Sequence, residues 1–204
     1  GPLIINYRFN AEKLPLTHWI YDSKEGGRII GEVWQAFELF CSFTNAVPIS
    51  ISVEVLGACE RNTSSSMDTI ITQLRMSDGS LCSLLYTSQG HPIVGKERIE
   101  LFFDGKTIIL DDFITLQGYG LPLAFNRHVS VADRGHQHLF EAFFAALHHS
   151  IYVSPISYER IIVATRISII AAHLARQGGG ETTIVNAALS CVPMDVETVF
   201  QDRA

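Results

Sequence analysis

The sequence predicts an α+β domain in which helices pack on one face of an open, mainly antiparallel β-sheet. Between residues 49 and 120, short apolar runs alternate with Asp-Gly pairs, which is the pattern of successive β-hairpins. Before and after that region, apolar residues recur every three or four positions, as in amphipathic helices. A strand, a helix, a run of hairpins and then further helices is the element order of an α+β domain.

The N-terminal elements are a strand and a helix. Residues 3–10, LIINYRFN, are β-branched and aromatic and predict a strand. After a loop with a glycine pair, residues 28–43 predict a helix that is mostly apolar. One side of this helix nevertheless carries three polar residues at helical spacing, Glu32, Gln35 and Glu38. They indicate a reaction centre, a solvated face or the remnant of a former site.

The middle of the chain predicts the rest of the sheet. Residues 49–57 alternate between apolar and polar, and hairpins are expected around the Asp-Gly pairs at 78–79 and 104–105. Residues 114–120, ITLQGYG, add a short strand. One face of this sheet has no predicted helix to cover it. The candidates to lie there are apolar residues: Ile71, Leu85, Phe102 and Ile109. An exposed apolar sheet face favours a dimer, with a half-solvated sheet as the alternative.

Two helices are expected in the C-terminal part. The first is indicated by an apolar stripe in helical spacing: Leu139, Phe140, Phe143, Phe144 and Leu147. The second covers about residues 157–176, with Ser157 as its expected cap and Gly178 as its end. We therefore expect one domain over residues 1–178, followed by a C-terminal tail over 179–204 whose structure the pattern does not indicate.

The composition excludes several classes of partner and compartment. A net charge of −6 and a pI near 5.7 argue against nucleic acid or an anionic membrane surface as the main partner. No run of about 18 apolar residues predicts a membrane span. The cysteines show no metal or redox spacing: Cys41, Cys59, Cys82 and Cys191. With no signal-peptide pattern, we expect reduced, mostly packed thiols and a cytoplasmic protein.

Common motifs for nucleotide, metal and acyl-transfer chemistry are missing. In GGRIIG, Arg28 stands where a G-x-G-x-x-G motif has its central glycine, and there is no P-loop. The histidine pairs at 136/138 and 148/149 are spaced so that their rings do not face each other on a helix. We therefore expect no metal site. The absence of G-x-S-x-G disfavours a serine hydrolase.

Three segments of the sequence carry a resemblance to a known family. In order, they read INYRFNAEKLPLTHWIYDSKEGGRIIGEVWQAFELF, GKERIELFFDGKTIILDDFITLQGYG and DRGHQHLFEAFFAAL. Together they resemble the C-terminal domain of the Gfo/Idh/MocA family of NAD(P)-dependent oxidoreductases, which act on sugars, inositols and related polyols. The resemblance covers about residues 3–178 and implies the same open sheet with helices on one face.

The resemblance also implies a role and partners. The chain would be the substrate-binding and oligomerisation domain of an oxidoreductase acting on a sugar, nucleotide sugar or polyol. NAD or NADP would be held mainly by an upstream Rossmann domain, so Gly1 and Pro2 would lie at a domain cut. The chain alone would bind no cofactor and show no activity. The far face of the sheet would build a homo-oligomer.

Several residues of this chain match the family's site positions. Glu32 matches a GE dipeptide, and Arg8 and Asn10 match the YRxNA motif, although a structural pair at a strand end is an equal alternative. The expected substrate-binding residues are Arg8, Asn10, His18, Trp19, Glu38 and Tyr119.

Gln35 is the main departure from the family pattern, because it falls where the family has its catalytic His. Glutamine can orient a hydroxyl group but cannot take its proton near neutral pH. The base would then be Glu32, a Lys of the upstream domain or another group, or catalysis has been lost. Two functions remain open: the substrate domain of a dehydrogenase, and a catalytically degenerate dimerisation or scaffold module.

Overall fold

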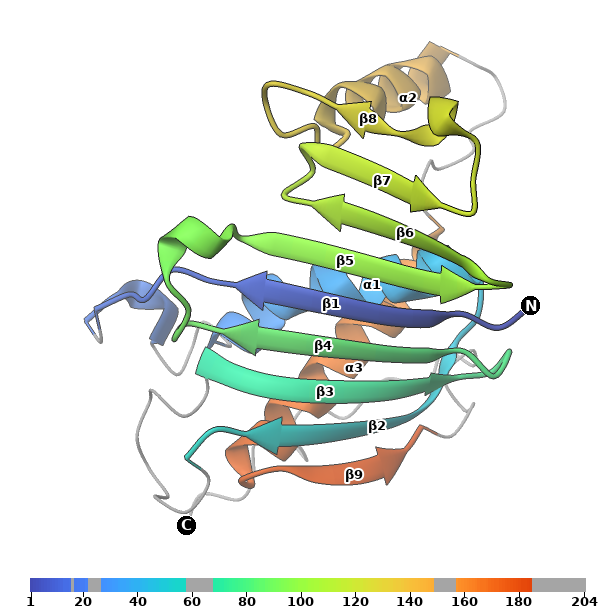
Figure 1. The fold of residues 1–204 in the computed structure, drawn as a ribbon. Coiled ribbons are helices and arrows are strands. Elements are labelled where there is room, and N and C mark those ends of the chain that lie inside the picture. Colours follow the sequence, from blue (N-terminus) through green and yellow to red (C-terminus); the bar gives the residue numbers. More distant parts are fainter. Residues whose placement is uncertain (16, 22–26, 58–67, 149–156, 185–204) are drawn as a thin grey trace.

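The computed structural model describes residues 1–15, 17–21, 27–57, 68–148 and 157–184. In this part of the chain, nine strands form one sheet in the order β8-β7-β6-β5-β1-β4-β3-β2-β9 (Figure 1). The strands are β1 (Ile4–Asn10), β2 (Pro48–Val55), β3 (Thr69–Met76), β4 (Leu81–Thr87), β5 (Glu97–Phe103), β6 (Lys106–Asp111), β7 (Thr115–Tyr119), β8 (Arg127–His128) and β9 (Gly180–Thr183). The helices are η1 (Trp19–Tyr21), η2 (Ile29–Val33), α1 (Trp34–Thr44), η4 (Pro92–Val94), η5 (Leu123–Phe125), α2 (His136–His148) and α3 (Tyr158–Arg176).

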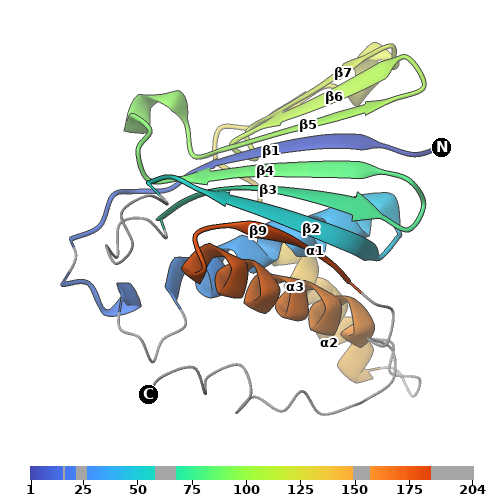
Figure 2. The ribbon, with the colours of Figure 1, turned by 90° about the horizontal axis from the view of Figure 1, so that it is seen from below.

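The sheet is open and mainly antiparallel, as predicted. Only β1 and β4 run parallel among the paired strands of the described residues. Helices α1 and α3 cover one face, which we call the inner face, and leave the opposite, outer face open (Figure 2). The prediction of an α+β domain with helices on one face of an open sheet is confirmed.

The core lies between the inner face and helices α1 and α3. Odd-numbered residues of β1 alternate into it, so that Ile5 and Tyr7 are buried. Phe37 and Phe40 of α1 and Ile167 of α3 are also fully buried. The helical spacing of these apolar side chains explains why the segments fold as helices against the sheet.

The predicted helix over residues 28–43 is present in two parts. Its first turn, η2, is a π-helix, and α1 continues to Thr44, where Asn45 takes a left-handed conformation with φ of 52°. This C-terminal geometry commonly ends a helix. The expected apolar side is buried at Val33, Phe37 and Phe40, whereas Gln35 is exposed. On the polar side, Gln35 is therefore open to solvent, whereas Glu32 and Glu38 are half-buried.

The C-terminal part differs from the prediction in two places. Ser157 precedes α3, but its hydroxyl donates to the Glu159 carboxylate and makes no cap bond to the helix backbone. Residues 180–183 form β9, which pairs with β2, so the sheet extends beyond Gly178. The sequence GETT has no apolar alternation, because β9 is a short edge strand with a largely exposed surface. Residues 185–204 of the expected tail lie outside the described residues.

The outer face carries the apolar residues expected there. Ile71 and Leu85 are direct cross-strand partners of β3 and β4, and Phe102 pairs with Ile4 between β5 and β1. Ile109 lies on the same face in β6, opposite Glu100. No helix in the described part of the chain is long and apolar enough to span a membrane.

Cys41 and Cys82 are free, buried thiols on α1 and β4, and the remaining two cysteines lie outside the described residues. Burial raises the pKa of Cys41 to about 11 and that of Cys82 to about 12. Both thiols should therefore resist alkylation in the folded protein at pH 8, because the thiolate is the reactive form.

A pH dependence of stability follows from these thiols. Above about pH 9 they ionise in the unfolded chain but stay protonated in the native state, so stability falls as the pH rises. We expect a loss of about 1.4 kcal/mol per thiol at pH 10 relative to neutral pH. Urea unfolding at pH 7 and pH 10 measures it. A Cys41→Ala, Cys82→Ala variant should show a shallower fall, and an identical fall in both proteins would contradict the assignment.

Candidate functional site

The candidate site lies at the carboxyl ends of β1 and β4. These two strands are parallel neighbours, with Asn10 opposite Thr87 at their ends, so the segments that leave them meet at one edge of the sheet. The loop after β1 leads through η1 to η2 at this same edge (Figure 1). A π-helical turn such as η2 is rare and is often found at functional sites.

A buried polar group occupies this edge, which we call the Arg28 cluster; its members are Tyr21, Arg28, Glu32, Asp68 and Tyr86. The Arg28 guanidinium donates to the Glu12 carbonyl at 2.8 Å. Its Nη2 lies 3.5 Å from Glu32 Oε2, and its Nη1 lies 3.8 Å from Asp68 Oδ2. The Tyr86 hydroxyl donates to Glu32 Oε2 at 2.7 Å, and the Tyr21 hydroxyl donates to Asp68.

Burial controls the electrostatics of the Arg28 cluster. The side chains of Arg28 and Asp68 are only 3% and 5% exposed, whereas Glu32 is 27% exposed. Burial raises the pKa of Asp68, and the Tyr21 hydrogen bond and the Arg28 charge oppose that rise. Burial, followed by the nearby Glu32 carboxylate, raises the pKa of Tyr86. Tyr86 therefore stays a protonated hydrogen-bond donor to Glu32.

One oxygen of Glu32, Oε2, thus interacts with two partners, the Tyr86 hydroxyl and the Arg28 guanidinium. Both interactions favour a carboxylate that anchors η2 to the sheet. A residue in this role is poorly suited to serve as the proton acceptor in a reaction. A catalytic part for Glu32 stays a prediction.

The side of η2 and α1 that faces solvent lies next to the Arg28 cluster, and we call it the α1 strip. Gly31 is exposed, and a side chain at its position would meet no atom within 4 Å. Gln35 is exposed one turn further on. Glu38 follows and accepts a hydrogen bond of 2.9 Å from the Ser42 hydroxyl. This strip offers polar hydrogen-bonding groups next to open space.

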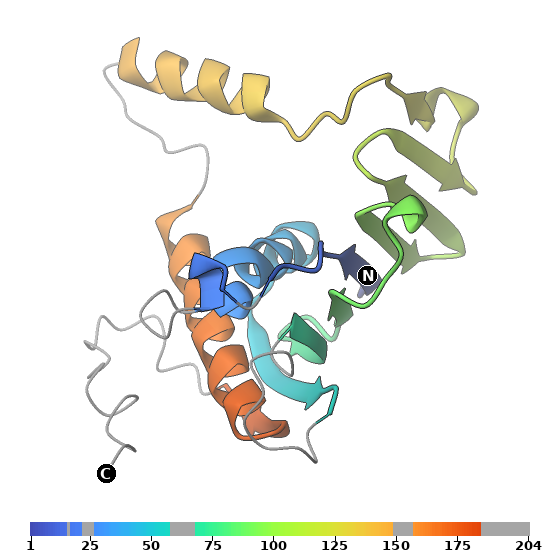
Figure 3. The same cartoon turned by 90° about the vertical axis from the view of Figure 1, so that its left-hand side faces the viewer.

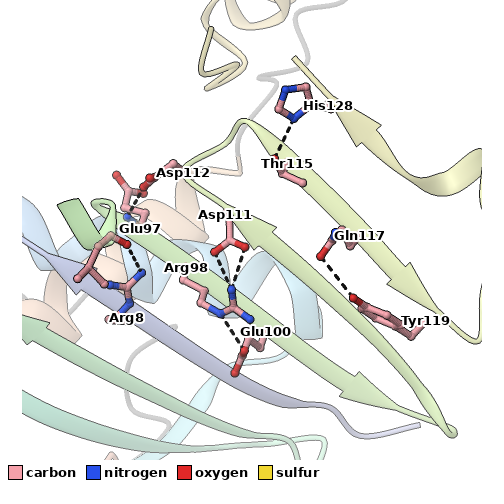
Figure 4. Close-up of polar contacts among 11 residues, drawn as sticks. Arg8, Glu97, Arg98, Glu100, Asp111, Asp112, Thr115, Gln117, Tyr119 and His128 are labelled. Atoms are coloured by element: carbon pink, nitrogen blue, oxygen red, sulfur yellow. Dashed lines mark hydrogen bonds and ion pairs between the residues drawn. The ribbon is translucent and has the colours of Figure 1, made fainter. Parts of the chain in front are cut away.

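Arg8 and Tyr119 lie on the outer face, on the opposite side of the sheet from Gln35. Side chains alternate along a strand, and because Tyr7 faces the core, Arg8 faces outward. Arg8 is the direct partner of Arg98, which is held by Glu100 at 2.9 Å and Asp111 at 2.8 Å (Figure 4). The Tyr119 hydroxyl donates to Gln117 at 3.4 Å (Figure 4). The structure does not bring these two residues to the α1 strip.

Asn10, His18 and Trp19 lie on the strand end and loop near the Arg28 cluster. The Asn10 amide donates to the carbonyls of His91 and Gly95 at 3.1 and 3.3 Å. It therefore holds the loop before β5, which agrees with the structural alternative for this residue. His18 Nδ1 accepts the Ile20 backbone N–H at 3.3 Å. Trp19 is 65% exposed and is available to contact a partner or ligand.

Sequence reasoning missed Tyr21, Asp68 and Tyr86. The hydrogen bond between Tyr86 and Glu32 spans 54 residues, and that between Tyr21 and Asp68 spans 47. No local spacing indicates such pairs. The one available signal was the alternation of β4, which puts Tyr86 on the inner face with Cys82 and Leu84. Within the described ranges, no group of three His, Cys, Asp or Glu residues could hold a metal ion.

Comparison with solved structures shows which proteins share this fold. The chain shares its fold with the corresponding part of a series of oxidoreductases, at sequence identities too low to show more than the fold. No protein-family model and no curated protein matches the sequence.

Three of these structures are enzymes of sugar or inositol oxidation. UDP-N-acetylglucosamine 3-dehydrogenase from Acidithiobacillus ferrooxidans matches with a TM-score of 0.62 and 14% identity, over 87% of this chain and 55% of the enzyme. Aldose-aldose oxidoreductase from Caulobacter crescentus matches with a TM-score of 0.66 and 13% identity, over 90% of this chain and 56% of the enzyme. A myo-inositol dehydrogenase from Corynebacterium glutamicum matches with a TM-score of 0.63 and 16% identity, over 90% of this chain and 56% of the enzyme. The chain spans little more than half the length of each.

Proposed function

We propose that this chain is the substrate-binding and oligomerisation part of an NAD(P)-dependent oxidoreductase that acts on a sugar, nucleotide sugar or polyol. The observation that carries the proposal is the polar strip along η2 and α1, in which Gly31 and Gln35 are exposed and Glu38 is half-buried. At Gly31 the strip borders open space, beside the buried ion pairs of the Arg28 cluster. The likeness of the fold to sugar and inositol dehydrogenases supports it.

A nucleotide-binding half of the enzyme would cover this strip. The chain itself lacks a glycine-rich phosphate loop, and Arg28 of GGRIIG is buried against acidic residues and so does not line a phosphate cradle. The dinucleotide would supply the hydride acceptor or donor and be held mainly by the other half. From this chain, the open surface at Gly31 and Gln35 would border it.

Gln35 would orient the substrate through hydrogen bonds. Its amide can donate to one hydroxyl oxygen and accept from another, which suits a polyol, but it cannot take a proton near neutral pH. Because Glu32 is held by Tyr86 and Arg28, the proton would pass to a group from the nucleotide-binding half, such as a lysine. His18 and Trp19 would line the side of the site nearest the loop after β1.

The second candidate is a non-enzymatic dimerisation or scaffold module. It is favoured by one observation, namely that Gln35 is an amide and the Glu32 carboxylate is already engaged by the Tyr86 hydroxyl and the Arg28 guanidinium. In both candidates the outer face would pair with a second copy of the chain. That face combines exposed apolar side chains, such as Ile71 and Phe102, with Arg75 and Glu181, so it offers both charge signs to an identical surface.

The location of the cofactor site is tested by calorimetric titration of NADH and NADPH into the 204-residue chain. We expect no binding, because no phosphate cradle is available. A micromolar Kd for either dinucleotide would overturn the assignment of the cofactor to another half. Substrate binding is measured separately, by titrating myo-inositol and aldoses at millimolar concentration into the same chain. Gln35→Ala is the control variant.

The role of Gln35 is tested by Gln35→His in a protein that carries both halves. If Gln35 orients substrate and the base comes from the other half, turnover stays the same or falls, and KM rises. A rise in turnover, which a newly placed general base can bring by a factor of about 10² or more, would instead mark Gln35 as the site of a lost base. Gln35→Asn, which keeps the amide, serves as the conservative control.

A further inference from the structure

Helix α2 carries an apolar stripe that no part of the described chain covers. Its residues are Leu139, Phe140, Phe143, Phe144 and Leu147, and we call them the α2 stripe. They are 43–61% exposed, and α2 has no buried residue. A single exposed Leu or Phe is ordinary on a protein surface, but five together on one helix face mark an interaction site.

The base of α2 is anchored, whereas the helix itself stands away from the core. Arg134, just before α2, forms an ion pair of 2.7 Å with the buried Glu97, which also accepts from the Tyr7 hydroxyl. The Asp133 N–H donates to the Phe113 carbonyl. Beyond this anchor, α2 extends over the helix side of the sheet, apart from α1 and α3 (Figure 3). A helix of 13 residues is marginal alone, so burial of its apolar side against a partner would stabilise it.

The sequence of α2 suits pairing with an identical helix. His136, Phe140, Phe143 and Leu147 follow a four-three-four spacing, which is the seam of a helix pair, and Leu139 and Phe144 flank it. Glu141 is the only acidic or basic residue of the helix apart from histidines, and it lies off the stripe. Two copies can therefore approach without Asp, Glu, Lys or Arg charges of like sign facing each other.

The area of the α2 stripe is sufficient for such a pair. With about 200 Å² for each fully exposed large apolar side chain, the stripe offers roughly 500 Å² per copy, or roughly 1,000 Å² for two. That reaches the lower limit for a specific interface between proteins. From the stripe's exposure, spacing, charge and area we infer that α2 pairs with α2 of a second copy of this chain around a two-fold axis.

This contact is independent of the outer-face contact proposed above. Helix α2 lies on the helix side of the sheet and the outer face lies on the other (Figures 2 and 3). The two contacts use different surfaces, so neither blocks the other. If their two-fold axes meet at right angles, together they close an assembly of four copies with two kinds of interface.

The test is the molar mass of the purified chain by light scattering at micromolar concentration. We expect four copies for the wild type and two for Phe140→Glu, Phe144→Glu. The matched control is Ala145→Glu, which adds a charge to the opposite side of the same helix and should leave the mass unchanged. Circular dichroism should show that the other elements stay folded, because the stripe packs against no other described element of its own chain.

A second variant separates this inference from the outer-face proposal. Ile71→Glu, Phe102→Glu should give two copies held by α2. If this variant is a monomer, or if the double Phe variant keeps the wild-type mass, pairing through α2 is overturned. If instead the wild type has two copies and only the α2 variant dissociates, α2 pairing stands and the outer-face contact fails. Hydrogen exchange should show α2 amides protected in the wild type and unprotected in the double Phe variant.

Discussion

Replacing Arg28 with methionine is expected to lower the free energy of unfolding by about 3–5 kcal/mol at pH 7, as removal of one member of a buried ion pair does. Asp68 would keep a buried charge without its cation, and Glu32 would lose its guanidinium partner. Chemical denaturation measures the loss. Arg75→Met is the matched control, since Arg75 is exposed on the outer face and should cost less than about 0.5 kcal/mol.

The pH dependence of the Arg28→Met effect identifies its cause. Burial already raises the pKa of Asp68 in the native state. A raised native pKa means that the folded protein binds more protons, so this group lowers stability as the pH rises through the acid range. Without Arg28 the fall becomes steeper, and the cost of the substitution at pH 4 should be smaller than at pH 7. An equal cost at both pH values would indicate lost packing and not an uncompensated charge.

Replacing Phe40 with alanine is expected to cost a similar 3–5 kcal/mol, for a different reason. Phe40 is fully buried between α1 and the sheet, with its ring centroid 6.4 Å from that of Tyr7 in an edge-on arrangement. The substitution loses the transfer free energy of the ring and leaves a cavity that the rigid sheet cannot close. The measurement is again denaturant unfolding at pH 7.

Phe43→Ala on the same helix is the control for Phe40. Phe43 is 39% exposed, so its removal opens no closed cavity and should cost about 1 kcal/mol or less. Equal losses for the two variants would mean that α1 does not pack on the sheet through its Phe37 and Phe40 side. Because Gln35 lies on the opposite side of this helix, the packing also fixes where the candidate strip points.

The two variants probe the two supports of the candidate strip. The first support is the apolar packing of α1 against the inner face. The second is the Arg28 cluster, which connects the π-helical turn η2 by hydrogen bonds to β4 and to the loop after β1. In the proposed oxidoreductase, both supports would hold Gln35 toward the nucleotide-binding half. A scaffold module needs the packing for stability but gains nothing from the orientation of Gln35.

The elements with strong periodicity were predictable from the sequence. Helix α3, the hairpins at the Asp-Gly pairs and the inward side of α1 follow from local spacing and turn chemistry. The π-helical turn and strand β9 were not predictable, because neither has a distinctive local pattern. Of the expected site residues, Gln35 and Glu38 share the α1 strip, whereas Arg8 and Tyr119 lie on the outer face. The resemblance in sequence indicated these residues as site positions, but it did not indicate on which side of the sheet each one lies.

By itself, the sequence determined the fold class and the polar side of α1, because period and turn residues act over a few neighbouring positions. Only the tertiary structure decided that Glu32 is tied to Tyr86 and Arg28, that Asp68 completes the anchor, and that no described part of the chain covers the α2 stripe. These relations join residues that are dozens of positions apart. They depend on the order of the strands and on the place where α2 leaves the sheet. Local periodicity in the sequence predicts neither the strand order nor that place.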